Sequence, residues 1–529
     1  MQTAVPAFIG YTAKAVVNGK SAAFTPVPVN SLADFEAAFG GAFNAVYDIA
    51  EVAGPPAPYH VAATRWDAAT QQFVTKFYAL ARTNATFNLY NSVRLFYASG
   101  GGPCYVVSIG DYTAAGSAPG GVAIDAAKLT QGLTAIGAQA GPTMLVVPDA
   151  VLLKPDATPS HGLPVSTAFN ALAQAMLAQC GALQDRVAIL DVYGADALNS
   201  RAPKNGTFDN DLTFLTENFQ NGVGDSFLNY GMAYFPFLVT SVVQPNEIDY
   251  RNFNIGEPDQ LALLQGILTD TASQLYSDPP NADPAQNRNP QFLAVKAMIA
   301  AIATTTGAGP IARLNQNLVN AVSLLQQMEN IIATKMNLLP PSGAMAGVYT
   351  LVDSSRGVWN APANVTPIAV VSASGPISAE QQEPLNVPLN GKAVNVIRDF
   401  VGRGPVVWGA RTLDGNSSDW RYINVRRTFI YIEQSIKLAL QALVFEPNVA
   451  TTWVAVTAMA SSFLRELWQQ GGLTGTTPQE AFSVQCGLGR TMTANDILEG
   501  NLIVQVTMAM IRPAEFIVLV LKQKMQGGT

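Results

Sequence analysis

Two aspartates occupy positions in this sequence where chemistry is often found. Asp149 and Asp191 each come directly after a run of apolar residues that predicts a buried strand. Catalytic groups of α/β proteins lie at such carboxyl ends of strands, but an aspartate there also caps the turn that follows. For both residues we favour the capping interpretation.

Hydrolysis by a serine would need a nucleophile, a base and a group that orients the base. Ser342, in the segment PPSGAMAG, faintly resembles a nucleophile segment, but no matching histidine motif accompanies it. The two histidines, His60 and His161, lie in loops rich in proline or in Pro, Ser and Gly. We therefore expect no catalytic residues.

Neither a metal nor a cofactor site is expected. Cys104, Cys180 and Cys486 are far apart, odd in number and without the spacing of metal ligands. The glycines of residues 99–103 (SGGGP) follow a predicted helix and precede a predicted strand. A phosphate-binding loop has the opposite order, because the amides at a helix N-terminus must face the anion.

Strands that alternate with helices predict an α/β fold with a largely parallel sheet. The runs CYVVSI, MLVVPDA and VAILDV are the buried strands of this part. Near the end of the chain, Arg427 to Phe445 and Thr451 to Gln470 have the apolar stripes of amphipathic helices. Asn501 to Ile511 alternates between apolar and polar residues, which predicts a half-buried strand.

The composition favours a protein that has much of its surface buried against other copies of itself. Only 13% of the 529 residues are charged, against about 25% in an average soluble domain. A monomer with a Ser, Thr, Asn and Gln surface is the alternative. The net charge of −7 and the lack of Lys/Arg runs argue against a nucleic-acid partner. No signal peptide is expected at the start, and no apolar run is long enough for membrane insertion.

Motifs in a fixed order run through nearly the whole chain. Those of the last quarter are GRGPVVWGARTL (402–413), WRYINVRR (420–427), VFEPN (444–448), FLRELWQQGGLTGTTPQEAF (463–482), TMTANDILEGNLIV (491–504) and RPAEFIV (512–518). Those upstream are VPAFIGYT (5–12), FYASGGGPCYVV, MLVVPDA, VAILDV and PPSGAMAGVYTLVDSSRGVWNAPAN. In these motifs the sequence resembles contractile tail sheath proteins, which occur in contractile phage tails, R-type pyocins and phage-tail-like extracellular injection systems. It is most similar to the antifeeding-prophage type of the last group.

This resemblance implies a multidomain tail-sheath fold of the α/β class, with a subtilisin-like α/β middle domain. Its C-terminal α/β domain would carry the interlinking terminal strands. The expected divisions are an N-terminal strand or arm packing with the C-terminal domain (1–29), an outer α/β region (30–361), a proline-dotted linker (362–392) and the C-terminal sheath domain (393–529). Such proteins carry a proline-glycine-valine-tyrosine arm before the VPAFIGYT segment. This sequence begins almost at that segment, so donation of a full N-terminal strand is not implied.

The function implied is mechanical. Copies of the chain would stack in hexameric layers around an inner tube protein, and the sheath would shorten to drive that tube through a target envelope. Further partners implied are baseplate proteins, tail-terminator or cap proteins and sister sheath proteins. Assembly would occur in the bacterial cytoplasm, within a particle that can be released. A non-contractile shell protein and a subtilisin-like hydrolase are the alternatives.

Two groups of residues are predicted to act between subunits. We expect the apolar end of the chain to add to another copy's sheet beside the first strand; the residues concerned are Val5, Phe8, Ile9, Glu515, Phe516, Ile517, Val518, Leu519 and Val520. Four charges on the helix from 427 and just before it are predicted to lie at an interface: Arg426, Arg427, Glu433 and Lys437. Acids in the same copy or in a neighbour, or solvent, would balance the two arginines, because a helix N-terminus disfavours cations.

Overall fold

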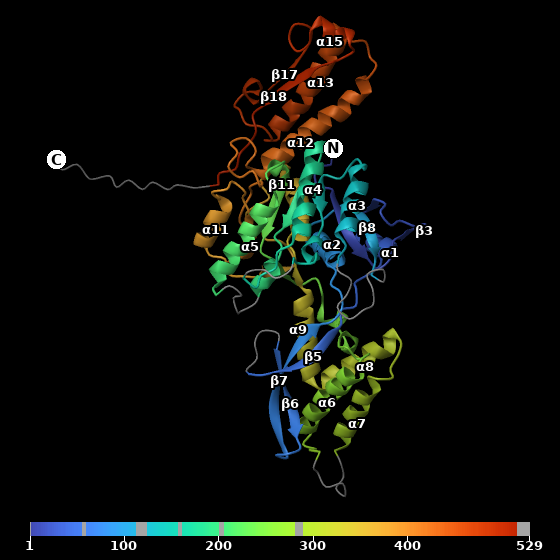
Figure 1. Cartoon of the computed structure of the whole chain (residues 1–529). Coiled ribbons are helices and arrows are strands. Elements are labelled where there is room, and N and C mark those ends of the chain that lie inside the picture. Colours follow the sequence, from blue (N-terminus) through green and yellow to red (C-terminus); the bar gives the residue numbers. More distant parts are fainter. Residues whose placement is uncertain are drawn as a thin grey trace, which may run out of the picture.

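The computed structural model describes residues 2–54, 60–112, 124–156, 161–199, 206–280 and 289–515. The chain has three parts in a row (Figure 1). A central α/β body lies between a distal lobe, which holds β5 to β7 and α6 to α9, and a C-terminal lobe, which holds α12 to α15 with β17 and β18.

Eight strands form the central sheet in the order β16-β15-β11-β10-β9-β1-β8-β4. Their bounds are β1 (Pro6–Thr12), β4 (Val27–Val29), β8 (Cys104–Asp111), β9 (Met144–Val146), β10 (Val187–Asp191), β11 (Gly231–Phe235), β15 (Asn395–Phe400) and β16 (Gly404–Val407). The six inner strands are parallel, and the edge strands β16 and β4 are antiparallel to their neighbours. The predicted parallel α/β sheet is confirmed.

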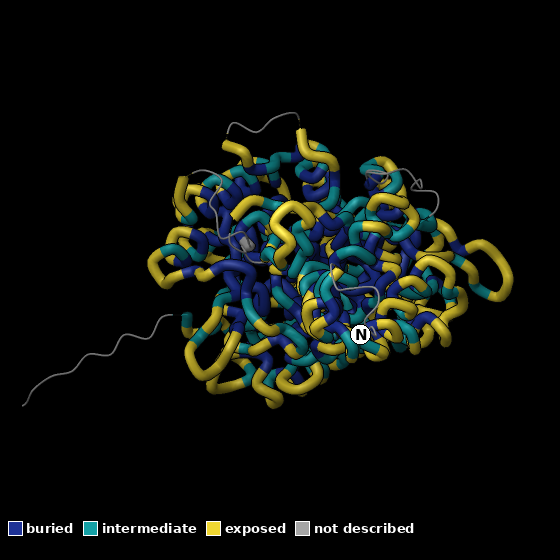
Figure 2. Tube along the Cα trace, turned by 90° about the horizontal axis from the view of Figure 1, so that it is seen from below, coloured by how far each residue is buried: buried dark blue, intermediate teal, exposed yellow. Residues whose placement is uncertain are grey.

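Helices cover both faces of this sheet, which is why its strands are continuous apolar runs. Helices α2 (Leu89–Ala98) and α10 (Ser342–Arg356) pack on one face, and α3 (Ala126–Gly137) and α4 (Thr167–Leu183) on the other. Helix α5 (Phe208–Gly222) packs on α4. Figure 2 shows the resulting interior as buried segments enclosed by exposed loops.

The distal lobe joins segments that are far apart in the sequence. Its strands β5 (Tyr47–Val52), β6 (His60–Asp67) and β7 (Gln72–Arg82) form an antiparallel sheet in the order β5-β7-β6. Its helices are α6 (Pro258–Leu275), α7 (Pro290–Ala301), α8 (Ala308–Ala321) and α9 (Ser323–Met336). Helices α8 and α9 are separated only by Val322, whose backbone is extended.

Smaller elements complete the three parts. They are β2 (Val16–Val17), β3 (Lys20–Ser21), α1 (Leu32–Phe39), β12 (Leu238–Thr240), β13 (Leu338–Leu339), β14 (Val370–Ala373) and α11 (Ala379–Asn386). Short 3-10 helices are η1 (Ala150–Leu152), η2 (Ala195–Asn199), η3 (Leu228–Tyr230), η4 (Pro245–Glu247), η5 (Tyr250–Asn252) and η6 (Gln441–Leu443).

The segment predicted as a linker, 362–392, is folded into the body instead. Its strand β14 pairs with β12, and its helix α11 packs on β15. The backbone N–H of Ala373 also donates to the carboxylate of Asp399, on β15. The prolines and low charge of residues 362–392 reflect turns within the central body rather than a linker between two bodies.

The C-terminal lobe has a small core of its own. Its elements are α12 (Ile423–Leu440), α13 (Ala450–Gln469), α14 (Pro478–Ala481), β17 (Phe482–Cys486), α15 (Ala494–Leu498) and β18 (Val504–Met508). Its buried apolar residues are Ile432, Leu464, Leu467, Leu473 and Ala481. The two long helices and the alternating strand are close to the predicted ranges. The predicted boundary at 393 is wrong, because β15 and β16 belong to the central sheet.

Candidate functional site

Asp149 lies near the carboxyl ends of the central parallel strands. Its carboxylate accepts backbone hydrogen bonds from Tyr11 (3.0 Å), Asn88 (2.6 Å) and Leu89 (3.2 Å), and so caps the start of α2. A Cβ on Gly10 would lie 2.4 Å from Asp149 Oδ2, so the carboxylate packs directly on the backbone of β1. Burial raises the pKa of Asp149 to about 6 against these hydrogen bonds. The expectation that Asp149 caps the turn that follows it is wrong, because its side chain makes no capping hydrogen bond to η1 and binds the first amides of α2 instead.

Asp191 caps α10 in the same way. Its carboxylate accepts from the backbone N–H of Ser342 at 2.8 Å and from the Ser342 hydroxyl at 2.6 Å. Burial raises the pKa of Asp191 to about 7. No histidine lies between the two groups, since they are in direct contact. His60 is on β6 in the distal lobe, and the ring of His161 packs edge-to-face against Phe214. The pair therefore fixes the start of α10.

Arg426 is enclosed by aromatic rings of its own chain. Its guanidinium lies 3.9 Å from the ring centroid of Tyr230, 4.7 Å from Trp420 and 5.6 Å from Phe429. It also donates to the Tyr230 hydroxyl. The residue is 5% exposed, and burial lowers its pKa. The prediction that Arg426 is an intersubunit charge is wrong, because ring faces inside the subunit take up its charge.

Arg427 forms a buried ion pair with Asp353 on α10, and this also corrects its assignment to an intersubunit interface. Two nitrogens of Arg427 lie 2.9 and 2.7 Å from the carboxylate oxygens, and both side chains are at most 4% exposed. The guanidinium also lies 4.5 Å from the ring centroid of Tyr349. Of the alternatives left open for the two arginines, Arg427 follows the one in which an acid of the same copy balances the charge.

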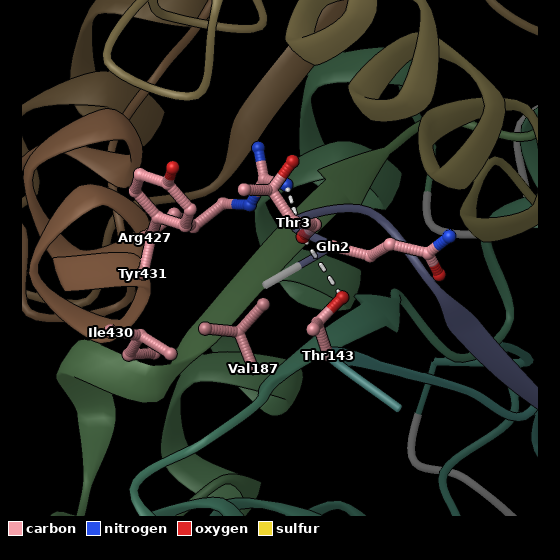
Figure 3. Close-up of a pocket in the computed structure, with 7 residues that line it drawn as sticks. All are labelled: Gln2, Thr3, Thr143, Val187, Arg427, Ile430 and Tyr431. Carbon is pink, nitrogen blue, oxygen red and sulfur yellow. Dashed lines mark hydrogen bonds between the residues drawn. The ribbon is translucent and has the colours of Figure 1, made fainter. Parts of the chain in front are cut away.

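The N-terminal residues meet α12 at this ion pair (Figure 3). The carbonyl oxygen of Thr3 accepts from Arg427 at 3.1 Å and from the Thr143 hydroxyl at 2.9 Å. Ile430 and Tyr431 of α12 line the same small pocket. The start of the chain thus contacts the C-terminal lobe, although the strand that follows it belongs to the central sheet.

Val5, Phe8 and Ile9 cannot exchange strands in this fold. Phe8 and Ile9 are fully buried on β1, and Val5 just before it is 4% exposed. Strand β1 pairs with β8 on one edge and with β9 on the other. Because both edges are occupied, the prediction that a neighbour's strand adds beside β1 is wrong. The predicted joining residues Phe516, Ile517, Val518, Leu519 and Val520 lie outside the described residues.

Strands β17 and β18 form a separate two-stranded sheet in the C-terminal lobe. They pair with each other in antiparallel register from Phe482↔Met508 to Cys486↔Val504, and within the described ranges neither has another strand neighbour. Alternate side chains pack on the lobe's core, and those between them are exposed. Sequence reasoning identified the β18 strand but missed β17, whose alternation in FSVQC is as regular but only five residues long.

Exposed apolar side chains gather on the same lobe. Of nineteen large apolar residues that are exposed in the described part of the chain, eight lie between residues 438 and 503. They are Leu438, Val444, Phe445, Val449, Val454, Leu488, Leu498 and Ile503. Phe445 is fully exposed, and its backbone has a left-handed φ of 72°, which residues other than glycine rarely adopt. Exposed apolar side chains that form a contiguous patch are typical of an interaction surface.

Glu433 and Lys437 remain from the predicted interface charges, and Glu515 remains from the predicted joining segment. Glu433 and Lys437 form an ion pair of 2.7 Å on the exposed part of α12. Glu515 pairs with Arg411 at 2.6 Å, beside a groove of about 550 Å³.

Within the described ranges, no helix is long and apolar enough to cross a membrane, and no three metal-binding side chains are grouped to hold an ion.

Comparison with known proteins agrees with this geometry. Residues 416–524 match the family described as the phage tail sheath C-terminal domain. The tail sheath protein of Burkholderia phage BcepMu is 28% identical over 199 residues, which is 35% of this chain and 42% of that protein. The chain thus aligns with less than half of this relative.

Similarity to solved structures extends over the whole chain. A chain of the anti-feeding prophage baseplate is 26% identical, with a TM-score of 0.57, and the match covers 99% of this chain and 94% of that one. The helical sheath of the same particle in its contracted state gives 26%, a TM-score of 0.55 and the same coverage. A sheath complex of the extracellular injection system PVC, 24% identical with a TM-score of 0.54 over 99% and 92% of the chains, shares the fold. The chain is thus similar to phage tail sheath proteins over its whole length, with a multidomain α/β fold, and its C-terminal part matches their C-terminal domain.

Proposed function

We propose that this chain is the structural subunit of a contractile sheath. Copies would stack in hexameric layers around an inner tube and shorten to drive that tube through a target envelope. The observation that supports this best is the similarity, over 99% of the chain, to the helical sheath of the anti-feeding prophage in its contracted state. The subunit would act without catalysis or a cofactor, through contacts between copies.

The proposed links between copies are main-chain hydrogen bonds. Residues 516–521 read FIVLVL, which is the composition of a strand buried on both faces. In the proposal, this segment of one copy adds to a free edge of the β17–β18 sheet of another copy. Strand addition of this kind gains affinity from backbone pairing, and alternate side chains set its register. Glu433 and Lys437 would lie beside such a contact as intersubunit charges.

The other proposed partners follow from the assemblies in which the similar chains were solved. One of them is a baseplate and another is a helical sheath. For this protein we propose contacts with an inner tube protein, a baseplate, and terminator or cap proteins, and mixed sheaths where sister sheath proteins occur. Assembly would take place in the bacterial cytoplasm, within a phage-tail-like particle that can be released.

Electron microscopy of the high-speed pellet from producing cells tests the function. We expect striated rods of two kinds, long and thin or short and wide, with this protein as a major band identified by mass spectrometry. A protein that stays in the supernatant as a small species, with no rods in the pellet, would contradict the proposal. Rods of one length and diameter only would indicate a static shell.

A pair of truncations tests the link. Deletion of residues 516–529 should abolish pelletable polymer and leave a folded subunit. Deletion of residues 525–529 keeps the apolar run and should leave assembly intact, so it is the matched control. Intact tubes from the longer deletion would show that copies join by other surfaces.

A further inference from the structure

Glu515 is held in its place by four hydrogen bonds from three parts of the chain. Arg411 donates to both carboxylate oxygens, at 2.8 and 2.6 Å. Asn386, at the end of α11, donates to Oε1 at 2.8 Å, and the hydroxyl of Tyr422 donates to Oε2 at 3.2 Å. We call these four residues the Glu515 clamp. A bidentate pair between Arg and a carboxylate is among the strongest polar contacts in proteins.

The clamp is largely shielded from water. The side chains of Arg411 and Glu515 are 4% and 16% exposed. Burial alone would raise the pKa of Glu515, but the hydrogen bonds from Arg411 and Asn386 outweigh burial and lower it. The carboxylate is therefore ionised at neutral pH, and its contact with Arg411 is only weakly screened by salt.

Arg411 is in turn fixed to the central sheet. Its backbone N–H donates to Asn395 Oδ1 at 2.8 Å, and its carbonyl accepts from Asn395 Nδ2 at 2.7 Å. Asn395 lies on β15 and also donates to the carbonyl of Ala233, on β11. A pull on residue 515 is thus passed through Arg411 to the inner strands of the sheet.

The clamp lies between the two parts that the proposed function joins. Strand β18 ends at Met508, and the run FIVLVL begins at Phe516. Between them the carbonyl of Ile511 accepts from Asn424 on α12 at 3.0 Å, and Glu515 enters the clamp. Seven residues, 509–515, separate β18, which is proposed to receive a neighbour's segment, from the apolar run that is proposed to join another copy.

We propose that the Glu515 clamp is the anchor of the joining segment, so that tension between sheath subunits passes to the central sheet rather than to the C-terminal lobe. The proposal rests on the proposed function. Without the clamp, the same tension would fall on the C-terminal lobe, first on the contact between Ile511 and Asn424 of α12 and then on β18. With it, the segment leaves the subunit from one fixed point, which sets where a neighbour can receive it.

Chymotrypsin cleavage after Phe516 in the unassembled subunit measures the clamp directly, because cleavage needs residues around 515 to leave their place. We expect Glu515→Gln to raise the cleavage rate by about tenfold or more, as a charge-assisted contact is lost. Asn386→Ala removes one neutral donor and should give a smaller increase. The control Glu51→Gln breaks the exposed ion pair with Lys76 in the distal lobe and should leave the rate unchanged.

Assembly gives the second measurement. The Glu515→Gln subunit should melt within a few degrees of the wild type, yet its pelleted fraction should fall several-fold, while Glu51→Gln sheaths form normally. Cleavage and assembly both equal to the wild type would overturn the proposal. If the wild-type chain forms no sheath, the proposed function fails, and the cleavage rate alone decides whether the clamp holds residue 515.

Discussion

Every inner strand of the central sheet has a neighbour on each edge, whereas β17 and β18 have only each other among the described residues. The side chains of β1 and β10 are buried on both faces, but those of β17 and β18 alternate between half-buried and exposed. The inner strands of the central sheet satisfy their backbone N–H and C=O groups within one chain. The edges of β17 and β18 leave a row of N–H and C=O groups that another strand can pair with.

The charged residues show the same contrast. Arg427 and Asp353 lie in the joint between α12 and α10 and are at most 4% exposed, so they act inside the subunit. Glu433 and Lys437, farther along the same helix, are 25% and 54% exposed. One helix therefore fastens the lobe to the body with its first turns and presents the rest outward. We infer that the body supplies stability and the lobe supplies the contacts.

Truncation of a buried side chain should show the largest difference in stability between the central sheet and the β17–β18 sheet. Phe8→Ala on β1 should lower the free energy of unfolding by about 3–5 kcal/mol, because it leaves a cavity beside Phe96 in a fully buried site. Val506→Ala on β18 should cost about 1 kcal/mol or less, because its site is only half-buried. Urea unfolding of the unassembled subunit measures both. Equal losses would contradict the contrast between the sheets.

Neighbouring arginines give a second comparison. Arg427→Met should cost about 3–5 kcal/mol, because it leaves the buried carboxylate of Asp353 without a partner. Arg426→Met should cost only about 1–2 kcal/mol, because it removes ring contacts and strands no opposite charge. Urea unfolding again measures both, and a larger loss for Arg426→Met would show that the rings hold the lobe more firmly than the ion pair does.

The pH dependence of stability should reveal the buried carboxylate of Asp191. Its pKa is about 7 in the folded chain, against an ordinary value of 3.8, so the folded state holds the proton more tightly. The stability that this gives is complete below about pH 4 and is lost as pH rises to 7, by about 1.4 kcal/mol for each pH unit within that window. Asp191→Asn should make the pH profile of the melting temperature shallower by this contribution, while Asp149 keeps its own. Parallel pH profiles for the two proteins would contradict it.

Loss of the exposed ion pair should have the smallest effect on folding. Glu433→Gln should change the free energy of unfolding by no more than about 0.5 kcal/mol, because exposed pairs contribute little. If the pair lies between subunits as proposed, the pelleted fraction should fall at the same time. An unchanged fraction, measured beside Glu51→Gln, would place the pair on a free surface.

Local patterns predicted many elements and some of their ends. The Ser31 hydroxyl caps α1 by accepting from the N–H of Asp34, and Gly40 ends that helix with a φ of 79°. The Asn18-Gly19 turn lies in a hairpin between β2 and β3. These signals act over a few residues, so they survive whatever the rest of the chain does. The ordered motifs also identified the family correctly, through residues rather than through shape.

The boundary at 393 failed for the opposite reason. Strand pairing across the sheet joins β11 to β15 over a gap of more than 150 residues, and no local pattern records which strand will be the neighbour. The partner of Arg427 was equally out of reach, since Asp353 is 74 positions away. Periodicity shows which face of an element is buried, but not against what.

By itself, the sequence determined the α/β class, most of the elements and the likeness to sheath proteins, because apolar periodicity, capping residues and ordered motifs are properties of neighbouring residues. Only the tertiary structure decided that β1 is closed on both edges, that Arg426 and Arg427 are internal, and that β17 and β18 remain open. Those outcomes depend on which backbone and charged groups find partners across the fold. Such pairing is settled by burial and distance in three dimensions, where each unsatisfied group carries a cost.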